Sequence, residues 1–118
     1  MDVTFDYHGP SILITISSYR SSLKKILESG CKIRYITEIT PENMEFCKEI
    51  INLMTELRHL DGLKGGIAIN ETEYMATTLI QNMQSLTEVY RSNAVNVIAQ
   101  GQYIFDTFWR NATPQVGK

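Results

Sequence analysis

Residues 56–70 read ELRHLDGLKGGIAIN, and this stretch decides the fold. Four ionisable side chains fall within seven residues, from Arg58 to Lys64, and three glycines interrupt or follow them. An apolar Ile-Ala-Ile run comes next. Glycines between two short apolar runs are typical of a tight turn that joins two strands. We therefore predict a strand over residues 55–60, a turn, and a second strand over residues 65–70, with the rest of the chain packed around them.

The composition is that of one globular domain over residues 1–118. Hydrophobic residues make up 43% of the chain and charged residues 20%, and the formal net charge is -2. This charge predicts no nucleic-acid partner, because domains that bind nucleic acid are usually basic. No apolar run approaches the ~20 residues of a membrane span and no secretory signal precedes Gly9, so we predict no membrane contact and a cytoplasmic location. The abrupt start of the chain predicts a domain excised from a longer protein.

The first third of the chain predicts a strand-helix-strand unit. Residues 3–7 alternate apolar and polar side chains and predict a strand, and residues 32–39 predict a second one. Between them, apolar residues recur at helical spacing, and Gly30 is a good helix stop. Residues 11–16 fit a helix or a strand, and we favour one helix over residues 11–29. A helix that connects two strands in this way predicts that the strands are parallel.

The remaining elements complete a predicted α/β fold, a mixed sheet of about five strands flanked by helices. A Thr-Pro pair at residues 40–41 predicts the start of a helix that ends near Met54. A strand over residues 74–80 is predicted to form a hairpin with the strand before it. The longest helix is predicted over residues 85–111, opened by a Ser-x-x-Glu capping box.

Gly101 lies within this last predicted helix, where glycine costs ~1 kcal/mol relative to alanine. A glycine there predicts that the backbone of this helix comes close to another element. The helix also carries a wide apolar stripe, and one helix face covers only part of that width against a single sheet. We therefore predict a homodimer through this helix, with Gly101 at the contact between the two copies. The alternative is a monomer in which Ala94, Val97, Ile98 and Phe105 all pack inside one chain.

Six residues are candidate ligand contacts. Arginine suits a bidentate anion contact, and histidine changes charge near neutral pH. Side chains beyond the carboxyl ends of parallel strands also commonly meet ligands. The candidates are Arg58, His59, Asp61, Lys64, Glu38 and Tyr7. The alternative is a structural ion pair of Arg58 or His59 with Glu56, Glu38 or Asp61.

No catalytic residue, metal site or cofactor is predicted. Cys31 and Cys47 have no metal-like spacing, and neither has a local signature that would pair it with His59 as a nucleophile. We predict that both are buried free thiols. The glycines of residues 62–66 are not a phosphate loop, because no Gly-Lys-Ser/Thr opens a helix after them.

Four segments resemble the input domain of archaeal sensor histidine kinases. They are GCKIRYITEIT over residues 30–40, ELRHLDGLKG over 56–65, EYMA over 73–76 and QYIFDTFWRNA over 102–112, and together they span most of the chain. The resemblance implies a sensory domain that precedes PAS and kinase modules, which would be its partners in the same chain.

More distantly, the layout resembles the phospholipase D-like fold that serves as a sensor in TrmB-type archaeal transcription regulators. Members of that superfamily with activity carry His-x-Lys-x4-Asp on a strand hairpin. If Asn70 takes the Asp place, Leu63 falls at the His place and Gly65 at the Lys place. The resemblance therefore implies half of such a fold without the catalytic motif, and binding rather than phosphodiester cleavage.

Together, the residues and these resemblances imply a non-catalytic sensory input domain of an archaeal signal-transduction protein of the histidine kinase type. It would bind an unknown small ligand or a partner domain. The alternative is a structural dimerisation module, and the third interpretation is a phosphodiesterase-type hydrolase.

Overall fold

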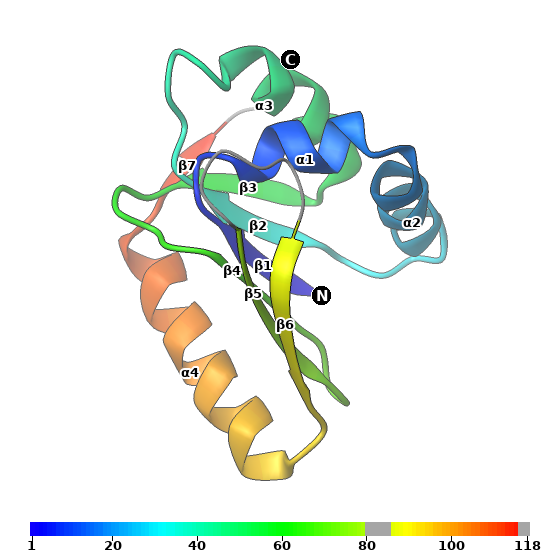
Figure 1. Ribbon diagram of the computed structural model, residues 1–118, viewed down its shortest axis with the longest axis vertical. Helices are drawn as coiled ribbons and strands as arrows, with labels where there is room; N and C mark the ends of the chain where they lie inside the picture. The colour runs from blue at the N-terminus through cyan, green and yellow to red at the C-terminus, as the bar shows by residue number, and fades with distance from the viewer. Residues whose placement is uncertain (80–85, 116–118) are drawn as a thin grey trace.

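Seven strands form one mixed sheet within residues 1–79 and 86–115, the part of the chain that the structure, a computed structural model, describes (Figure 1). In their order across the sheet, the strands are β6 (Leu86–Ser92), β5 (Tyr74–Leu79), β4 (Gly66–Ile69), β1 (Asp2–Phe5), β2 (Arg34–Thr37), β3 (Glu56–His59) and β7 (Thr113–Gln115). The helices are α1 (Gly9–Thr15), α2 (Ser17–Glu28), α3 (Met44–Ile50) with the short 3-10 helix η1 (Ile51–Leu53), and α4 (Val95–Asn111). The predicted α/β class with a mixed sheet is confirmed, although the sheet has more strands than the five or so expected.

The parallel centre of the sheet is built from β1, β2 and β3. Val3 pairs with Tyr35 on β2, and Tyr35 pairs with Leu57 on β3, both in parallel register. On the other side of β1, β4, β5 and β6 add antiparallel strands, while β7 runs antiparallel to β3. The predictions that the first two strands are parallel and that β4 and β5 form a hairpin are both confirmed.

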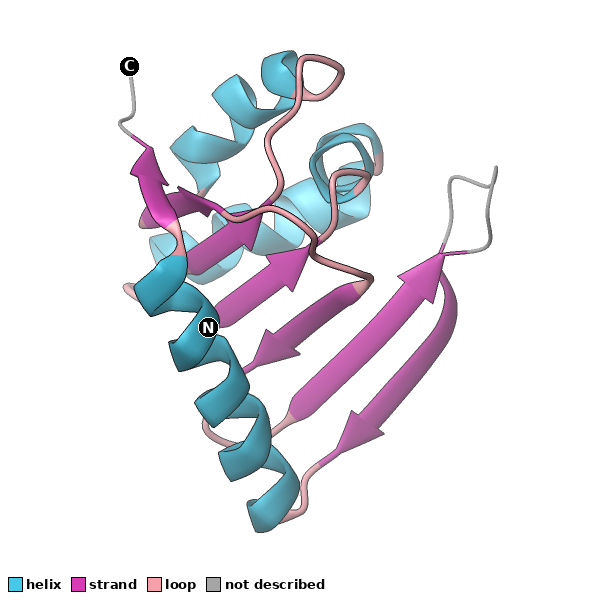
Figure 2. Ribbon diagram, turned by 90° about the vertical axis from the view of Figure 1, so that its left-hand side faces the viewer, coloured by secondary structure: helices cyan, strands magenta, loops and turns pink. Residues whose placement is uncertain are grey.

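Helices cover the two faces of the sheet unequally. α1, α2 and α3 pack on one face and α4 crosses the other (Figures 1 and 2). The larger core lies under α1 to α3, where Val3, Tyr35 and Leu57 meet the apolar sides of these helices. The smaller core lies under α4, where Phe105 packs on Ile36 and Ile69. None of the helices within the described ranges is long and apolar enough to cross a membrane.

Residues 11–15 are helical, but the single helix predicted over residues 11–29 is divided. α1 ends at Thr15, Ile16 has an extended backbone (φ -86°, ψ 107°), and α2 begins at Ser17. The break lets α1 bury Ile12 and Ile14 while α2 turns a different side, with Leu23, toward the sheet. A continuous helix would have kept a single axis, so it could not have turned the apolar residues of both α1 and α2 toward the sheet.

The helix predicted from residue 40 begins later, at Met44. Asn43 causes the delay, because its Oδ1 accepts a hydrogen bond from Thr40 N (2.8 Å) and fixes a turn ahead of α3. α3 then ends at Ile50, and η1 continues the chain to Leu53. The Thr-Pro pair therefore marks a turn rather than the first helical residues.

The helix predicted over residues 85–111 is wrong in its first part. Leu86–Ser92 forms β6, which pairs antiparallel with β5, and the helix starts only at Val95. Apolar residues there fit both a helical and a strand pattern, and pairing with β5 decides between them. The predicted cap at Ser85 lies outside the described residues.

Gly101 is buried in α4, and the predicted close approach is confirmed. A Cβ atom at this position would collide with the ring of Tyr74 on β5 and lie 3.3 Å from Ile69 Cδ1. The neighbour is therefore the sheet of the same chain, and Gly101 is not placed at a contact between two copies of α4 as predicted.

Candidate functional site

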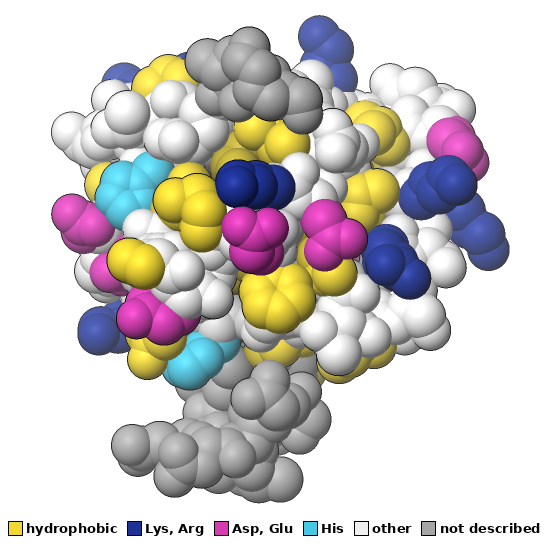
Figure 3. Space-filling model, turned by 90° about the horizontal axis from the view of Figure 1, so that it is seen from above, with side chains coloured by type: hydrophobic (Ala, Val, Ile, Leu, Met, Phe, Trp, Pro, Cys, Tyr) yellow, Lys and Arg dark blue, Asp and Glu magenta, His cyan; other side chains and the backbone are white. Residues whose placement is uncertain are grey.

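The carboxyl ends of β1, β2 and β3 meet at one edge of the sheet, where most of the predicted contact residues lie. Tyr7 follows β1, Glu38 follows β2, and His59 ends β3. Asp61 and Lys64 stand in the loop between β3 and β4. Figure 3 shows this side of the molecule, on the left, with histidine side chains among acidic ones.

His59 is held at this edge by both ring nitrogens. Its Nδ1 accepts a hydrogen bond from Ile39 N at 2.9 Å, so in the neutral ring the proton lies on Nε2. Nε2 faces Asp61 Oδ1 at 3.0 Å. The neutral imidazole therefore has no free lone pair. This geometry supports the structural pairing of His59 with Asp61, which was the alternative to a ligand contact.

Acidic side chains fasten the glycine loop of residues 62–65 to the strand ends. Glu38 Oε1 accepts from Gly62 N at 3.1 Å, and Asp6 Oδ2 accepts from Gly65 N at 3.1 Å. The φ angles of Gly62 and Gly65 are 84° and 62°, which favour glycine. These carboxylates thus complete a turn that the glycines make possible.

Asn43 ties the same edge together, and sequence reasoning missed it. The side chain is buried, and its Nδ2 donates to Tyr7 O (3.0 Å) and Glu38 O (2.9 Å). One amide therefore joins the loops after β1 and β2. The available signal was an Asn shortly after Thr-Pro, a typical turn composition.

Arg58 lies on the opposite face of the sheet from its neighbour His59, because side chains alternate along a strand. Its Nε contacts Glu56 Oε2 at 2.9 Å, its Nη1 donates to Trp109 O at 2.8 Å, and the guanidinium carbon lies 3.9 Å from the centre of the Trp109 ring. Arg58 thus anchors the end of α4 on β3. The structural ion pair with Glu56 is the alternative that the geometry supports.

Arg34 makes a second anchor on the α4 face. It contacts Asp2 at 2.7 Å and lies 5.0 Å from the ring centres of Phe105 and Trp109. Burial raises the pKa of Asp2, but hydrogen bonds from Arg34 and Gln102 outweigh this effect and leave the pKa below its ordinary value. The charged groups on this face therefore hold α4 in place.

Two of the predicted contacts are largely free. Tyr7 is 46% exposed, with its ring 4.1 Å from that of His8, and Lys64 is exposed. The structure thus gathers Tyr7, Glu38, His59 and Asp61 near one edge, with Lys64 in the adjoining loop, and places Arg58 elsewhere. A ligand role for these residues stays a prediction.

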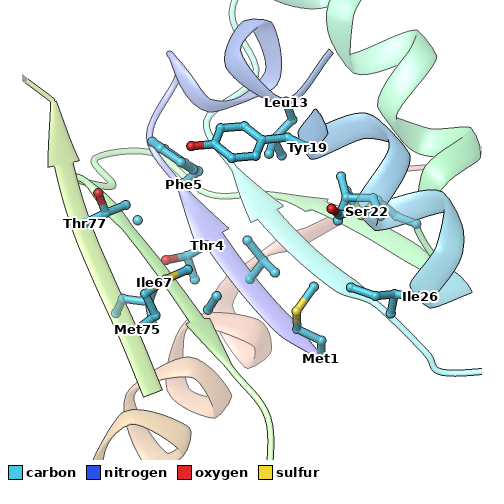
Figure 4. Close-up of a pocket in the computed structure, with 15 residues that line it drawn as sticks. Met1, Thr4, Phe5, Leu13, Tyr19, Ser22, Ile26, Ile67, Met75 and Thr77 are labelled. Atoms are coloured by element: carbon cyan, nitrogen blue, oxygen red, sulfur yellow. The ribbon is translucent and has the colours of Figure 1, made fainter. Parts of the chain in front are cut away.

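An apolar pocket of about 220 Å³ lies on the other side of the molecule (Figure 4). It opens between α2 and the part of the same sheet face, over β4 and β5, that α1 to α3 leave uncovered. Its walls include Met1, Phe5, Leu13, Tyr19, Ile67 and Met75. Neither Arg58 nor His59 lines it.

The exposed face of α2 is the third notable surface. Arg20, Lys24 and Lys25 are exposed there, and we call them the α2 basic surface. Lys and Arg side chains gather on this side of the molecule, at the right of Figure 3. A concavity of about 500 Å³ adjoins it, lined by Arg20, Ser21, Lys24, Leu27, Glu28, Asn52 and Leu53.

No protein-family model and no curated protein matches this chain. Among solved structures, the chain is similar to TrmBL2, described as an archaeal chromatin protein whose structure "shows a novel mode of DNA binding". The TM-score is 0.58 at 15% sequence identity, and the match covers 97% of this chain and 44% of that chain. At this identity the match establishes a shared fold alone, and it agrees with the TrmB-type fold that the distant resemblance implied.

This match contradicts the function predicted from the sequence. That prediction was a ligand-binding input domain of a histidine kinase, acting in signal transduction without a nucleic-acid partner. The fold neighbour is instead a chromatin protein that binds DNA. Both the kinase-sensor interpretation and the exclusion of nucleic acid are therefore corrected.

Proposed function

We propose that this chain is a non-enzymatic α/β domain of a DNA-associated archaeal protein of the TrmB type. The fold match to TrmBL2 over 97% of the chain is the observation that carries the proposal. The chain spans 44% of that protein's length, so a role beside further domains is part of the proposal. Association with DNA would also suit the predicted cytoplasmic location.

The net charge of -2 is compatible with DNA binding. Phosphate contacts depend on the local field of a surface, and the sum over a whole chain hides a basic region that acidic residues elsewhere offset. Many acidic side chains of this chain serve internal bonds, as Asp2, Asp6, Glu38 and Glu56 do. The composition argument was therefore too coarse to exclude a nucleic-acid partner.

The bonding of the strand-end residues supports a role without catalysis. A phosphodiesterase of the phospholipase D type needs a histidine whose ring nitrogen attacks phosphorus, next to a lysine. His59 has its Nδ1 occupied by Ile39 N and its Nε2 directed at Asp61. The His-x-Lys spacing is missing as well, since Leu60 and Asp61 follow His59.

The direct test is titration of a fluorescently labelled DNA duplex with the chain, followed by anisotropy. We expect binding that weakens steeply as salt rises, because counterions leave the phosphates on binding. An anisotropy that stays flat at low salt, for a chain shown to be folded by circular dichroism, would reject DNA contact by this domain.

A dimerisation module is the second candidate, and the outer face of α4 favours it. Val95 is 80% exposed and Tyr103 is 68% exposed, both on the side of the helix away from the sheet. Large exposed apolar side chains on one helix face are common at protein interfaces. Dimerisation and DNA association are compatible, since many DNA-binding proteins act as dimers.

A further inference from the structure

We infer that the α2 basic surface is where this domain contacts the phosphate backbone of duplex DNA. The inference rests on the proposed function and names the site for it. It rests on three features of Arg20, Lys24 and Lys25: their positive charge, their exposure, and their lack of ion-pair partners among the described residues. It rests also on the concavity beside them.

The three cations of α2 are free to bind an external anion. Within residues 1–79 and 86–115, none of them has an ion-pair partner. Other cations do have one: the pairs are Arg34 with Asp2, Lys48 with Glu45, Arg58 with Glu56, and Arg91 with Glu73. Unpaired cations give up only their hydration on meeting a phosphate, whereas paired ones must first leave a carboxylate.

The spacing on α2 suits a row of phosphates. Arg20 and Lys24 are four residues apart, so they are neighbours on one side of the helix, with their Cβ atoms about 5–6 Å apart. The planar guanidinium of Arg20 can bind a phosphate through two parallel hydrogen bonds. The hydroxyl of Ser21, in the same concavity, is a further donor of the kind that contacts phosphate oxygens.

The position of α2 favours a long duplex over a small anion. α2 lies at the periphery of the molecule, at the right of Figure 1 and away from α4. Its cations stand on a convex helix beside a shallow concavity and are exposed, so a rod of phosphates can reach all three. The aromatic residue of α2, Tyr19, lines the apolar pocket instead, which leaves α2 without an exposed ring for stacking single-stranded bases.

One carboxylate opposes this role. Glu28 lines the same concavity one helical turn after Lys24. Its charge lowers the local positive field, but three cations against one carboxylate leave the surface positive. If DNA lies on this surface, Glu28→Gln should strengthen binding, since a repulsion between carboxylate and phosphate is removed.

The test compares two triple variants with the same change in charge. The site variant is Arg20→Gln, Lys24→Gln, Lys25→Gln, and the control is Lys64→Gln, Arg91→Gln, Arg110→Gln, whose residues are also exposed but lie away from α2. Glutamine keeps helix propensity close to that of Lys and Arg. Anisotropy of a labelled duplex is followed over a salt series for both variants, for Glu28→Gln and for the unmodified chain.

For the unmodified chain, we expect log Kobs to fall against log salt with a slope of about -2.7, from three phosphate contacts at about -0.9 each. The site variant should lose binding and most of the slope, the control should keep the slope, and Glu28→Gln should bind more tightly.

Equal weakening of both triple variants would overturn the location while the proposed function stands. If the unmodified chain does not bind the duplex, both the proposed function and the inferred site are wrong. Displacement of DNA by inorganic phosphate, beyond that by chloride at equal ionic strength, would also overturn the inference in favour of a small-anion site.

Discussion

The hydroxyl group of Tyr35, on β2, is fully buried in the core. It has no hydrogen-bond partner among the described residues. Burial raises its pKa, because an ionised oxygen would be poorly solvated there. An unpaired buried hydroxyl costs free energy that a phenyl ring does not. We expect Tyr35→Phe to leave the unfolding free energy unchanged or to raise it by up to about 1 kcal/mol. Urea denaturation measures this, and a loss of about 1 kcal/mol would show a bond to a neighbour such as Thr37.

The two cysteines should differ in reactivity. Both are free, as predicted, but Cys31 is exposed rather than buried, because the loop before β2 turns it outward. Burial raises the pKa of Cys47 to about 11, so little thiolate forms there at neutral pH. A thiol reagent at about pH 8 should therefore modify one thiol rapidly in the folded chain and both in denaturant. Two rapid equivalents without denaturant would contradict this burial.

The positions and bonding partners of the candidate site residues could be predicted from the sequence only in part. The opposite directions of the neighbouring side chains Arg58 and His59 follow from the alternation along a strand, since the period of two is fixed by the backbone. Their partners were less accessible, because Trp109 O and Ile39 N come from elements distant in sequence. Asn43 was missed for the same reason: its two acceptors lie in different loops.

At the scale of elements, local patterns sufficed where the neighbours were also local. The apolar runs on either side of the polar turn at residues 70–73 correctly predicted β4 beside β5. β6 and β7 were not predicted, because each is extended through pairing with a strand that is formed elsewhere in the chain. Leu86–Ser92 pairs with β5, and Thr113–Gln115 pairs with β3 after α4. Edge strands of this kind are specified by pairing more than by composition.

The contact between α4 and β5 gives a prediction for Gly101. Alanine there should favour the helix by up to ~1 kcal/mol, but its Cβ would collide with the Tyr74 ring. Overpacking usually costs about 1–3 kcal/mol, so Gly101→Ala should lower the melting temperature. The double variant Gly101→Ala, Tyr74→Ala should cost less than the sum of the single changes. Strict additivity, measured by denaturation, would show that the two residues do not meet.

At the scale of the whole molecule, the exposed apolar residues of α4 predict self-association. Light scattering at micromolar concentration should give a mass above the 13.5 kDa of one chain, and Tyr103→Ser should return it toward that value. Tyr7→Ser, a change of the same kind at another exposed tyrosine, serves as the control. A mass of 13.5 kDa at every concentration would exclude the dimer.

The distribution of charge is also a property of the whole molecule. Composition gives a weakly acidic chain, whereas the fold gathers Arg20, Lys24 and Lys25 on one helix and places acidic residues in internal bonds. A sum of charges cannot reveal this separation, since it depends on which carboxylates the folded chain uses. This explains why the sequence predicted the fold class well and the partner wrongly.

The most direct measurement is an NMR titration of the isotopically labelled chain with an unlabelled DNA duplex. Amide signals report each residue, so binding and its location are read together. The proposed function with its inferred site predicts that signals of α2 and of the neighbouring concavity shift as duplex is added, and that added salt reverses the shifts. Signals that stay unchanged throughout the chain, at duplex concentrations well above that of the protein, would contradict a role in DNA association.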